Sequence, residues 1–174
     1  MKQEVKMENV MRKIRLEKVV LSCGATGHDL EKAQKLLEML SGKKAQIIKA
    51  GPKRRIPNFS VKPYLPLGAR VTLRKKEAVQ ILGRLLGAID NQLSKSQISE
   101  NNFSFGIKEY IEIPGTEYKR EIGIRGLNVT VVFNRPGLRV KRKKIKSSNL
   151  PAKQIVSAEE IINFMEENFD TEVE

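Results

Sequence analysis

The sequence predicts an α+β fold in which an antiparallel-rich sheet carries helices packed on one face and a long basic loop. Two patterns and the order of the elements support this class. Apolar and polar residues alternate at residues 69–74, as in a strand with one buried face. Apolar residues recur at helical spacing at residues 30–40. Strands and helices follow one another along the chain, and a sheet covered by helices on one side would bury their apolar faces together.

The first elements follow from these patterns. Residues 1–10 are polar and are expected to be flexible, and residues 11–174 are expected to form a single domain. Residues 14–22 predict a strand, which the glycines of residues 24–27 end. In the next helix, Asp29 is expected to be the N-cap and Gly42 the end. Its inward residues are predicted to be Leu30, Ala33, Leu36, Leu37 and Leu40.

The middle of the chain predicts two more strands and a long helix. Residues 45–49 form a short strand. After the basic loop, Ala69, Val71 and Leu73 alternate with Arg70, Thr72 and Arg74, so the two sets lie on opposite faces. A helix is predicted for residues 76–93, in which Gly83 and Gly87 either weaken the helix or allow a close approach. Its inward residues are predicted to be Ala78, Leu82, Leu85, Leu86, Ile89 and Leu93.

The last third predicts the remaining strands and a terminal helix. Residues 94–102 predict a polar loop, and strands are expected at residues 103–107, 110–113 and 128–133. Pro136 and Gly137 end the sheet region. The sequence Ser157-Ala-Glu-Glu160 is a capping box that opens the last, acidic helix. The inward residues of this helix are predicted to be Ala158, Ile161, Ile162, Met165 and Phe169.

The charge distribution indicates a polyanionic partner. The formal net charge is +13, and the eleven Lys and Arg residues between Glu38 and Glu77 are interrupted by no acidic residue. Residues 135–146 hold seven basic residues in twelve, whereas residues 159–174 hold seven acidic residues and no basic one. Since ordinary solvated faces mix both signs, nucleic acid is the favoured partner, with a membrane surface or a merely soluble face as the alternatives.

The basic loop, here called the arm, covers residues 50–66 and has two interpretations. It holds four basic residues, no acidic residue and four prolines. It is either a solvated loop without a partner or an extension that contacts a negative surface. Phe59 and Tyr64 are candidates for stacking on RNA bases. They are equally compatible with anchoring the arm to the sheet.

Catalytic and metal-binding chemistry is not indicated. The single cysteine, Cys23, excludes an intrachain disulfide, and the single histidine, His28, is expected at the surface. The Gly-rich turn before the first helix lacks the Lys-Ser/Thr of a P-loop. Carboxylates do not cluster outside the acidic end, so no metal or cofactor is expected. No apolar run suggests a signal peptide or a bilayer span, and the default expectation is a cytosolic protein with no membrane partner.

Five segments of the sequence carry a resemblance: MRKIRLEKVVL (11–21), LEKA with LLEMLSG (30–33 and 36–42), GARVTLR (68–74), NFSFGI (102–107) and RPGLRV (135–140). In order and spacing they resemble the family of large ribosomal subunit protein five, which binds 5S rRNA. Since RNA binding by so basic a chain with few aromatic residues would depend on phosphate contacts, the resemblance agrees with the charge pattern. The final basic and acidic segments resemble those of archaeal members of the family. The resemblance covers about residues 9–170.

The resemblance implies a structural constituent of the large ribosomal subunit, cytoplasmic and without enzymatic activity. It implies contacts with 5S rRNA and large-subunit rRNA in the central protuberance. The arm is implied to reach P-site tRNA, and the protein to bridge to small-subunit protein thirteen in the head. The implied 5S rRNA site is Ser22, Lys43, Lys44, Thr72 and Arg74. The implied tRNA site is Lys53, Arg54, Arg55, Asn58, Phe59 and Lys62.

The basic segment, residues 135–146, is expected to lie along large-subunit rRNA, or to be a disordered tail attracted to any polyanion. Its candidate contacts are Arg139, Lys141, Arg142, Lys143 and Lys144. The acidic helix is expected to pack on the body and to face protein rather than RNA. Two positions depart from the family pattern: Ser22 stands where the family has asparagine, and Lys43 where it has glutamine. Thr72 matches the family, although a strand would favour threonine for its β propensity alone.

Two other function classes remain open on the sequence. A free RNA chaperone or regulator would use the same basic surface but would show little preference among RNAs. An RNA-processing enzyme would need a metal or catalytic cluster, which the sequence does not offer. Only the ribosomal interpretation predicts that the protein binds 5S rRNA in preference to other RNAs.

Overall fold

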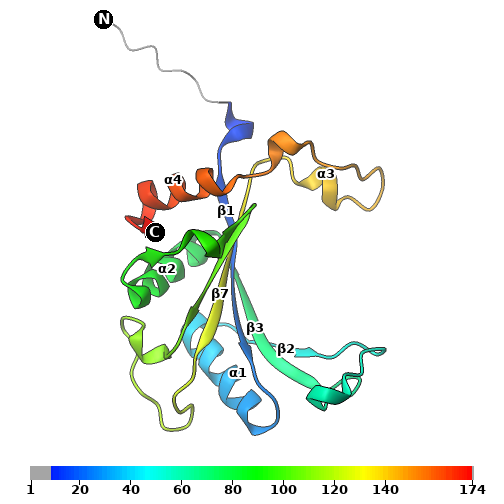
Figure 1. The fold of residues 1–174 in the computed structure, drawn as a ribbon, viewed down its shortest axis with the longest axis vertical. Coiled ribbons are helices and arrows are strands. Elements are labelled where there is room, and N and C mark those ends of the chain that lie inside the picture. Colours follow the sequence, from blue (N-terminus) through cyan, green and yellow to red (C-terminus); the bar gives the residue numbers. More distant parts are fainter. Residues whose placement is uncertain (1–8, 174) are drawn as a thin grey trace, which may run out of the picture.

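The computed structural model describes residues 9–173 and is built on a six-stranded sheet (Figure 1). The strand order is β2-β3-β1-β7-β6-β5, and every neighbouring pair is antiparallel. Helices α1 (His28–Ser41) and α2 (Lys75–Leu86) lie on one face of this sheet. The predicted α+β class is thus confirmed. The strands are β1 (Arg15–Gly24), β2 (Gln46–Lys49), β3 (Pro66–Arg74), β5 (Ile98–Ser99), β6 (Asn102–Ile107) and β7 (Leu127–Asn134).

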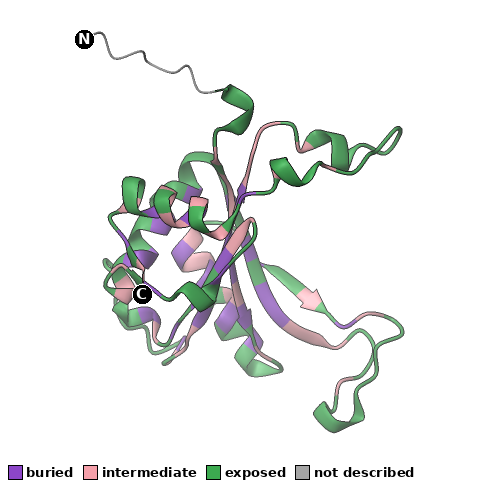
Figure 2. Cartoon of the chain, turned by 45° about the horizontal axis from the view of Figure 1, so that its top comes forward, coloured by how far each residue is buried: buried purple, intermediate pink, exposed green. Residues whose placement is uncertain are grey.

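The core lies between the sheet and the helices. Every second residue of the central strands is buried, because successive side chains of a strand point to opposite faces. Figure 2 shows buried residues gathered on the strands of the sheet. In β3 the buried residues Ala69, Val71 and Leu73 alternate with exposed Arg70, Thr72 and Arg74, as predicted. Full burial of a Val or Leu side chain contributes about 1.5–3 kcal/mol. The buried side of α1 consists of the five predicted residues Leu30, Ala33, Leu36, Leu37 and Leu40.

The C-terminal part folds back onto the end of the sheet. Helix α4 (Ala158–Phe169) begins with the predicted capping box between Ser157 and Glu160. Its Phe164 ring meets Phe133 of β7 edge-on, with centroids 5.4 Å apart. The chain ends in β8 (Glu172–Val173), which pairs in parallel with β4 (Gln92–Leu93). A short helix α3 (Arg139–Arg142) lies in the basic segment between β7 and α4.

The N-terminus of α1 differs from the prediction. Gly42 ends the helix in the left-handed conformation, with φ of 64°, as expected. The N-cap, however, is Gly27, and Asp29 lies in the first turn. The Asp29 carboxylate does not cap the helix, because its Oδ1 accepts from the guanidinium of Arg125 at 2.7 Å. His28, the first helical residue, is exposed as expected.

The helix predicted for residues 76–93 is shorter than expected. Helix α2 ends at Leu86, and a 3-10 turn, Gly87–Ile89, follows. Asp90 and Asn91 both take positive φ, which ends the helical path. Leu93 is buried, but from β4, where it pairs with Val173. The apolar spacing continued past the true end of the helix because Leu93 is a core residue of a different element.

Residues 110–113 were predicted as a strand and form a 3-10 turn, Tyr110–Glu112, instead. Tyr110 is fully buried, and its hydroxyl accepts from the backbone N–H of Lys119 at 2.8 Å. Thr116 Oγ1 donates to the Tyr110 carbonyl at 2.7 Å. These bonds use backbone groups that a strand would pair with a neighbour. The predicted loop at residues 94–102 likewise contains a 3-10 turn, Lys95–Gln97, and strand β5.

The N-terminal prediction is only partly covered by the structure. Residues 1–8, most of the segment expected to be flexible, lie outside the described part. Asn9 is the N-cap of a 3-10 turn, Val10–Arg12, and its side chain accepts from the N–H of Met11 at 3.0 Å.

Candidate RNA-binding surface

The face of the sheet opposite the helices, here called the open face, carries polar side chains from several strands. In β1, Ser22 lies opposite Asn128 of β7 on one side and Arg70 of β3 on the other. Thr72 occupies the same face of β3 and is exposed. Polar side chains on a solvated sheet face leave their hydrogen-bonding groups free for a ligand.

Four polar residues around the open face were not singled out from the sequence. A hollow on this face is lined by Ser22 together with Ser104, Asn128, Thr130 and Gln97. Ser104 pairs directly with Thr130 across β6 and β7. The sequence of residues 128–133 could have identified two of them. Val129 and Val131 are buried, so the alternation of a strand places Asn128 and Thr130 on the opposite, open face.

Acidic side chains are nearly absent from the sheet. Glu17 is the only Asp or Glu in its six strands, and its side chain is 7% exposed. Burial alone would raise the pKa of Glu17, but hydrogen bonds from Arg142 and Arg74 and the charges of Arg142 and Lys18 outweigh this effect and lower it. The exposed part of the open face is therefore neutral or positive.

The predicted 5S site residues divide into two groups. Ser22, Thr72 and Arg74 lie on the open face. Lys43 follows α1, and its ammonium is paired with the Glu77 carboxylate of α2, on the helical side of the sheet edge. Lys44 is exposed and lies two residues before edge strand β2. The structure thus brings three of the five residues together and places the two lysines at the edge.

The arm leaves the sheet between β2 and β3 and extends away from the body (Figures 1 and 2). Two backbone bonds close its base, from Ala50 N–H to Leu65 at 2.8 Å and from Tyr64 N–H to Ala50 at 3.2 Å. A bridge between Ile56 and Val61 and the 3-10 turn Pro57–Phe59 shape its tip. All six predicted tRNA-site residues are exposed: Lys53, Arg54, Arg55, Asn58, Phe59 and Lys62.

The two aromatic residues of the arm are not buried against the sheet. Phe59 is 77% exposed and Tyr64 is 64% exposed. An anchoring role would bury these rings, since aromatic side chains contribute to packing through the large area they remove from water. The structure therefore favours the interpretation in which the rings are available to a partner.

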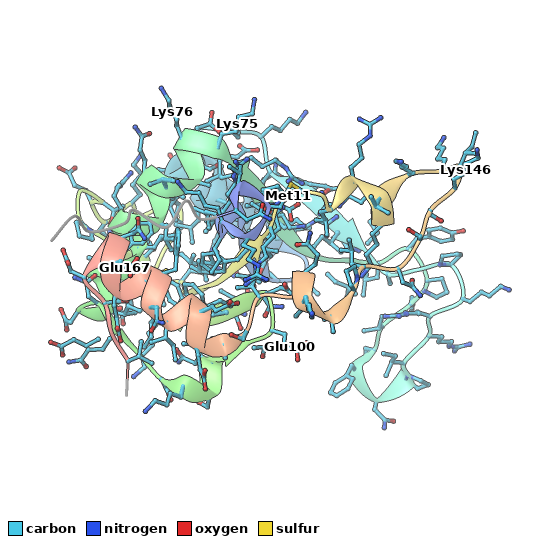
Figure 3. All side chains as sticks on the ribbon, turned by 90° about the horizontal axis from the view of Figure 1, so that it is seen from above. Met11, Lys75, Lys76, Glu100, Lys146 and Glu167 are labelled. Atoms are coloured by element: carbon cyan, nitrogen blue, oxygen red, sulfur yellow. The ribbon has the colours of Figure 1, made fainter. Side chains whose placement is uncertain are left out.

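The basic segment also projects from the body, and the labelled Lys146 lies at its far end in Figure 3. Arg139, Lys141, Lys143 and Lys144 are exposed, whereas the guanidinium of Arg142 reaches back to Glu17 at 2.6 Å. The segment is fixed at its start by Arg135, which donates to the Lys153 carbonyl at 2.6 Å and to Glu160 at 2.5 Å.

The arm and the basic segment project on the same side of the molecule, away from α1 and α2 (Figures 1 and 3). Helix α4, which carries the labelled Glu167, lies on the other side. The open face is thus flanked by two basic projections, and the acidic helix is kept apart from them. This separation of charge would orient a long polyanion along the open face.

Comparison with known proteins identifies the family. Residues 9–62 match the family model described as ribosomal protein L5, and residues 66–164 match the model for the C-terminus of the same ribosomal family. The chain belongs to the ribosomal protein L5 family. It is 41% identical to large ribosomal subunit protein uL5 of Nanoarchaeum equitans, covering 96% of this chain and 99% of that protein. Identity to uL5 of Sulfolobus acidocaldarius is 40%, over 98% and 97% of the two chains.

Membership in the ribosomal protein L5 family confirms the resemblance seen in the sequence, including its archaeal type. The chain is a structural constituent of the large ribosomal subunit, not an enzyme, and works in the ribosome, in the cytoplasm. Binding of 5S rRNA is general for the family.

The single cysteine lies in the core and not on the open face. Cys23 is buried, its Sγ lies 3.3 Å from the Gly126 carbonyl, and burial raises the pKa of its thiol. Within residues 9–173, His, Cys, Asp and Glu side chains form no group that could hold a metal ion. No helix in the described part of the chain has the length and apolar character to cross a bilayer.

Proposed function

We propose that the chain binds 5S rRNA through its open face and contacts large-subunit rRNA and P-site tRNA through its two basic projections. The observation that carries this proposal is the composition of the open face. It is polar, it is bordered by Arg70 and Arg74, and its one acidic residue, Glu17, is buried beneath arginines. A phosphate backbone would meet hydrogen-bond donors and positive charge there without exposed carboxylates.

The 5S rRNA site comprises Ser22, Thr72 and Arg74 on the open face, with Lys43 and Lys44 at its edge. Ser22 and Thr72 supply hydroxyl groups that both donate and accept, which suits ribose hydroxyls and phosphate oxygens. Lys43 is engaged by Glu77 in the free protein, so its contact with RNA would replace an existing ion pair. We therefore expect Lys43 to contribute less than Arg74.

The arm contacts P-site tRNA in this proposal. Its basic side chains are exposed, and the described residues contain no ion pair that neutralises them. Phe59 stands at the tip with its ring in solvent, where it can pack on a ribose or an unstacked base. The closed base of the arm fixes the direction of its projection.

Two further contacts complete the proposal. The basic segment lies along large-subunit rRNA through Arg139, Lys141, Lys143 and Lys144. The protein also bridges to small-subunit protein thirteen in the head, as the family resemblance implies. The organisation of residues 11–174 as a single domain is part of the same proposal, supported by one core that joins residues from β1 to α4.

The test is binding of the purified chain to 5S rRNA at 50 and 200 mM salt with excess tRNA as competitor. Contact with six to ten phosphates would lower affinity roughly 10³–10⁵-fold over this range, using the DNA relation as a guide. The proposal expects 5S rRNA to remain bound in the presence of tRNA, and Thr72→Ala to weaken the complex. If excess tRNA displaces 5S rRNA from the protein, the result would instead indicate a free RNA chaperone without preference among RNAs.

The arm requires a separate test in the assembled ribosome. Ribosomes containing Arg54→Ala and Arg55→Ala are compared with wild type for retention of P-site tRNA. The proposal expects faster release of tRNA while 5S rRNA binding by the purified variant stays unchanged. If the variant ribosomes retain P-site tRNA as well as wild type does, the proposed contact between the arm and tRNA is wrong.

A further inference from the structure

Two arginines from distant parts of the chain meet at one carboxylate on the open face. Glu17 Oε1 accepts from Arg74 Nη1 at 3.3 Å and from Arg142 Nη2 at 2.6 Å. Its other oxygen accepts from the side-chain amide of Asn134 at 3.0 Å. Strands β1, β3 and β7 and helix α3 are therefore linked through this one side chain.

A β-bulge at Glu17 makes this arrangement possible. Leu16 and Val19 both face the core although they are three residues apart, which regular alternation would forbid. The pairing of β1 with β7 shifts between Leu16 and Lys18, so Glu17 is the extra residue. Bulges redirect side chains in this way. As a result, the carboxylate is turned toward Arg74, which stands on the open face.

The arginines keep most of their hydrogen-bonding capacity. The Glu17 side chain is 7% exposed, but those of Arg74 and Arg142 are 52% and 54% exposed. Each guanidinium has five N–H donors, and one nitrogen of each bonds Glu17. Because both nitrogens bond the same oxygen, the two groups are held side by side, although their charges repel each other. The remaining donors lie at the surface, where they suit phosphate oxygens.

We propose that Glu17 is a positioning residue that holds Arg74 and Arg142 as a single clamp for one backbone phosphate of 5S rRNA. This proposal rests on the proposed function and deepens it. The sequence assigned Arg74 to the 5S rRNA site and Arg142 to the basic segment. Their shared carboxylate makes them one site, so Arg142 of the basic segment serves the same RNA as the open face.

The test compares 5S rRNA affinities of wild type and Glu17→Gln in the full chain, for example by fluorescence anisotropy. Removing a carboxylate raises the net charge by one, so nonspecific attraction predicts tighter binding. Loss of the clamp predicts the opposite, about tenfold weaker binding, since one charge-assisted contact is worth about that much. Glu166→Gln makes the same charge change on an exposed residue of α4 and is expected to leave affinity unchanged or slightly higher.

A second pair of variants leaves Glu17 intact, in case its replacement prevents folding. Arg142→Lys retains the charge but loses the planar guanidinium that bonds Glu17 and phosphate together. Arg120→Lys makes the same change at an exposed arginine to which no RNA contact is assigned. The clamp requires weaker 5S rRNA binding for Arg142→Lys alone, and a Glu17→Gln effect that largely disappears in the Arg142→Lys background.

The outcomes separate the two proposals. Wild type that does not prefer 5S rRNA over tRNA contradicts the proposed function itself. Wild type with that preference, together with unchanged or tighter binding by Glu17→Gln, overturns the clamp alone. Equal effects of Arg142→Lys and Arg120→Lys would also overturn it, because position 142 would then differ in no way from any other exposed arginine.

Discussion

Asn101 and Val156 are joined by two hydrogen bonds that attach the C-terminal part to the sheet. The N–H of Asn101 donates to the Val156 carbonyl at 3.0 Å, and the N–H of Val156 donates to Asn101 Oδ1 at 2.9 Å. Val156 is fully buried. The asparagine side chain thus pairs with the backbone as a neighbouring strand would, and it fixes the chain to the sheet two residues before α4.

We predict that Asn101→Ala lowers the free energy of unfolding by about 2–4 kcal/mol. The buried N–H of Val156 would lose its acceptor, which costs about 1–3 kcal/mol, and alanine would take the positive φ of 63° less readily than asparagine. Urea unfolding followed by circular dichroism measures the change. Asn91→Ala is the control, because Asn91 has a similar φ of 57° but makes no side-chain hydrogen bond within the described residues. Equal losses would assign the whole effect to backbone conformation.

Gly83→Ala is predicted to stabilise the protein. Gly83 lies inside α2, and a Cβ built there has no heavy atom within 4 Å. Alanine in a helix interior is favoured over glycine by about 0.5–1 kcal/mol. The thermal midpoint should therefore rise, which differential scanning calorimetry can measure. Of the two roles considered for this glycine, weakening of the helix is the one the structure supports. A fall in the midpoint would contradict it.

Gly126→Ala is predicted to have the opposite effect. A Cβ at this position would lie 2.6 Å from the Lys108 carbonyl oxygen and 2.7 Å from that of Ile107, both backbone atoms that cannot move aside alone. We expect a loss of about 1–3 kcal/mol from overpacking. Increased thiol labelling of Cys23, whose Sγ donates to the Gly126 carbonyl, would report the same distortion. Unchanged stability together with unchanged labelling would show that the contact can relax.

Glu17 should make stability depend on pH. Its pKa is lowered from the ordinary value of 4.5, so its carboxylate stabilises the fold above that value, and this contribution is lost as pH falls through the lower, folded-state pKa. Glu17→Gln is predicted to cost about 1–3 kcal/mol at pH 7. The difference between wild type and variant should shrink in acid. Glu38, whose pKa is also lowered by bonds from Gln34 and Ala45, is present in both proteins and cancels in the difference.

A constant difference down to pH 2 would contradict this assignment. The variant would then lose stability through packing rather than through its charge. The series of unfolding curves needed for the comparison also shows whether Glu17→Gln is folded at the pH of the RNA-binding experiment.

The sequence predicted what depends on local periodicity. Alternation in β3 placed Thr72 and Arg74 on the open face, and helical spacing identified the buried side of α1. The capping box at Ser157 correctly marked the start of α4. In each case one short stretch of chain contains the whole signal, because the side-chain period of a strand or helix follows from its backbone geometry.

Tertiary partners explain what the sequence did not predict. Leu93 continues the helical spacing of α2 but pairs with Val173, about eighty residues later. The bulge at Glu17 follows from pairing with β7. The meeting of Arg74 with Arg142 requires the fold of the whole chain. Such contacts between distant segments leave no periodic signal, and the two arginines were therefore assigned to separate RNA sites.

The last prediction concerns Phe59, the exposed ring at the tip of the arm. Phe59→Ala should change the free energy of unfolding by less than about 0.5 kcal/mol, because a side chain that is 77% exposed contributes little to packing. Phe103→Ala, the same truncation at a fully buried position, should cost about 3–5 kcal/mol. If Phe59 serves tRNA, Phe59→Ala should still weaken tRNA retention in assembled ribosomes. A loss of stability comparable to that of Phe103→Ala would instead show that the ring anchors the arm to the sheet.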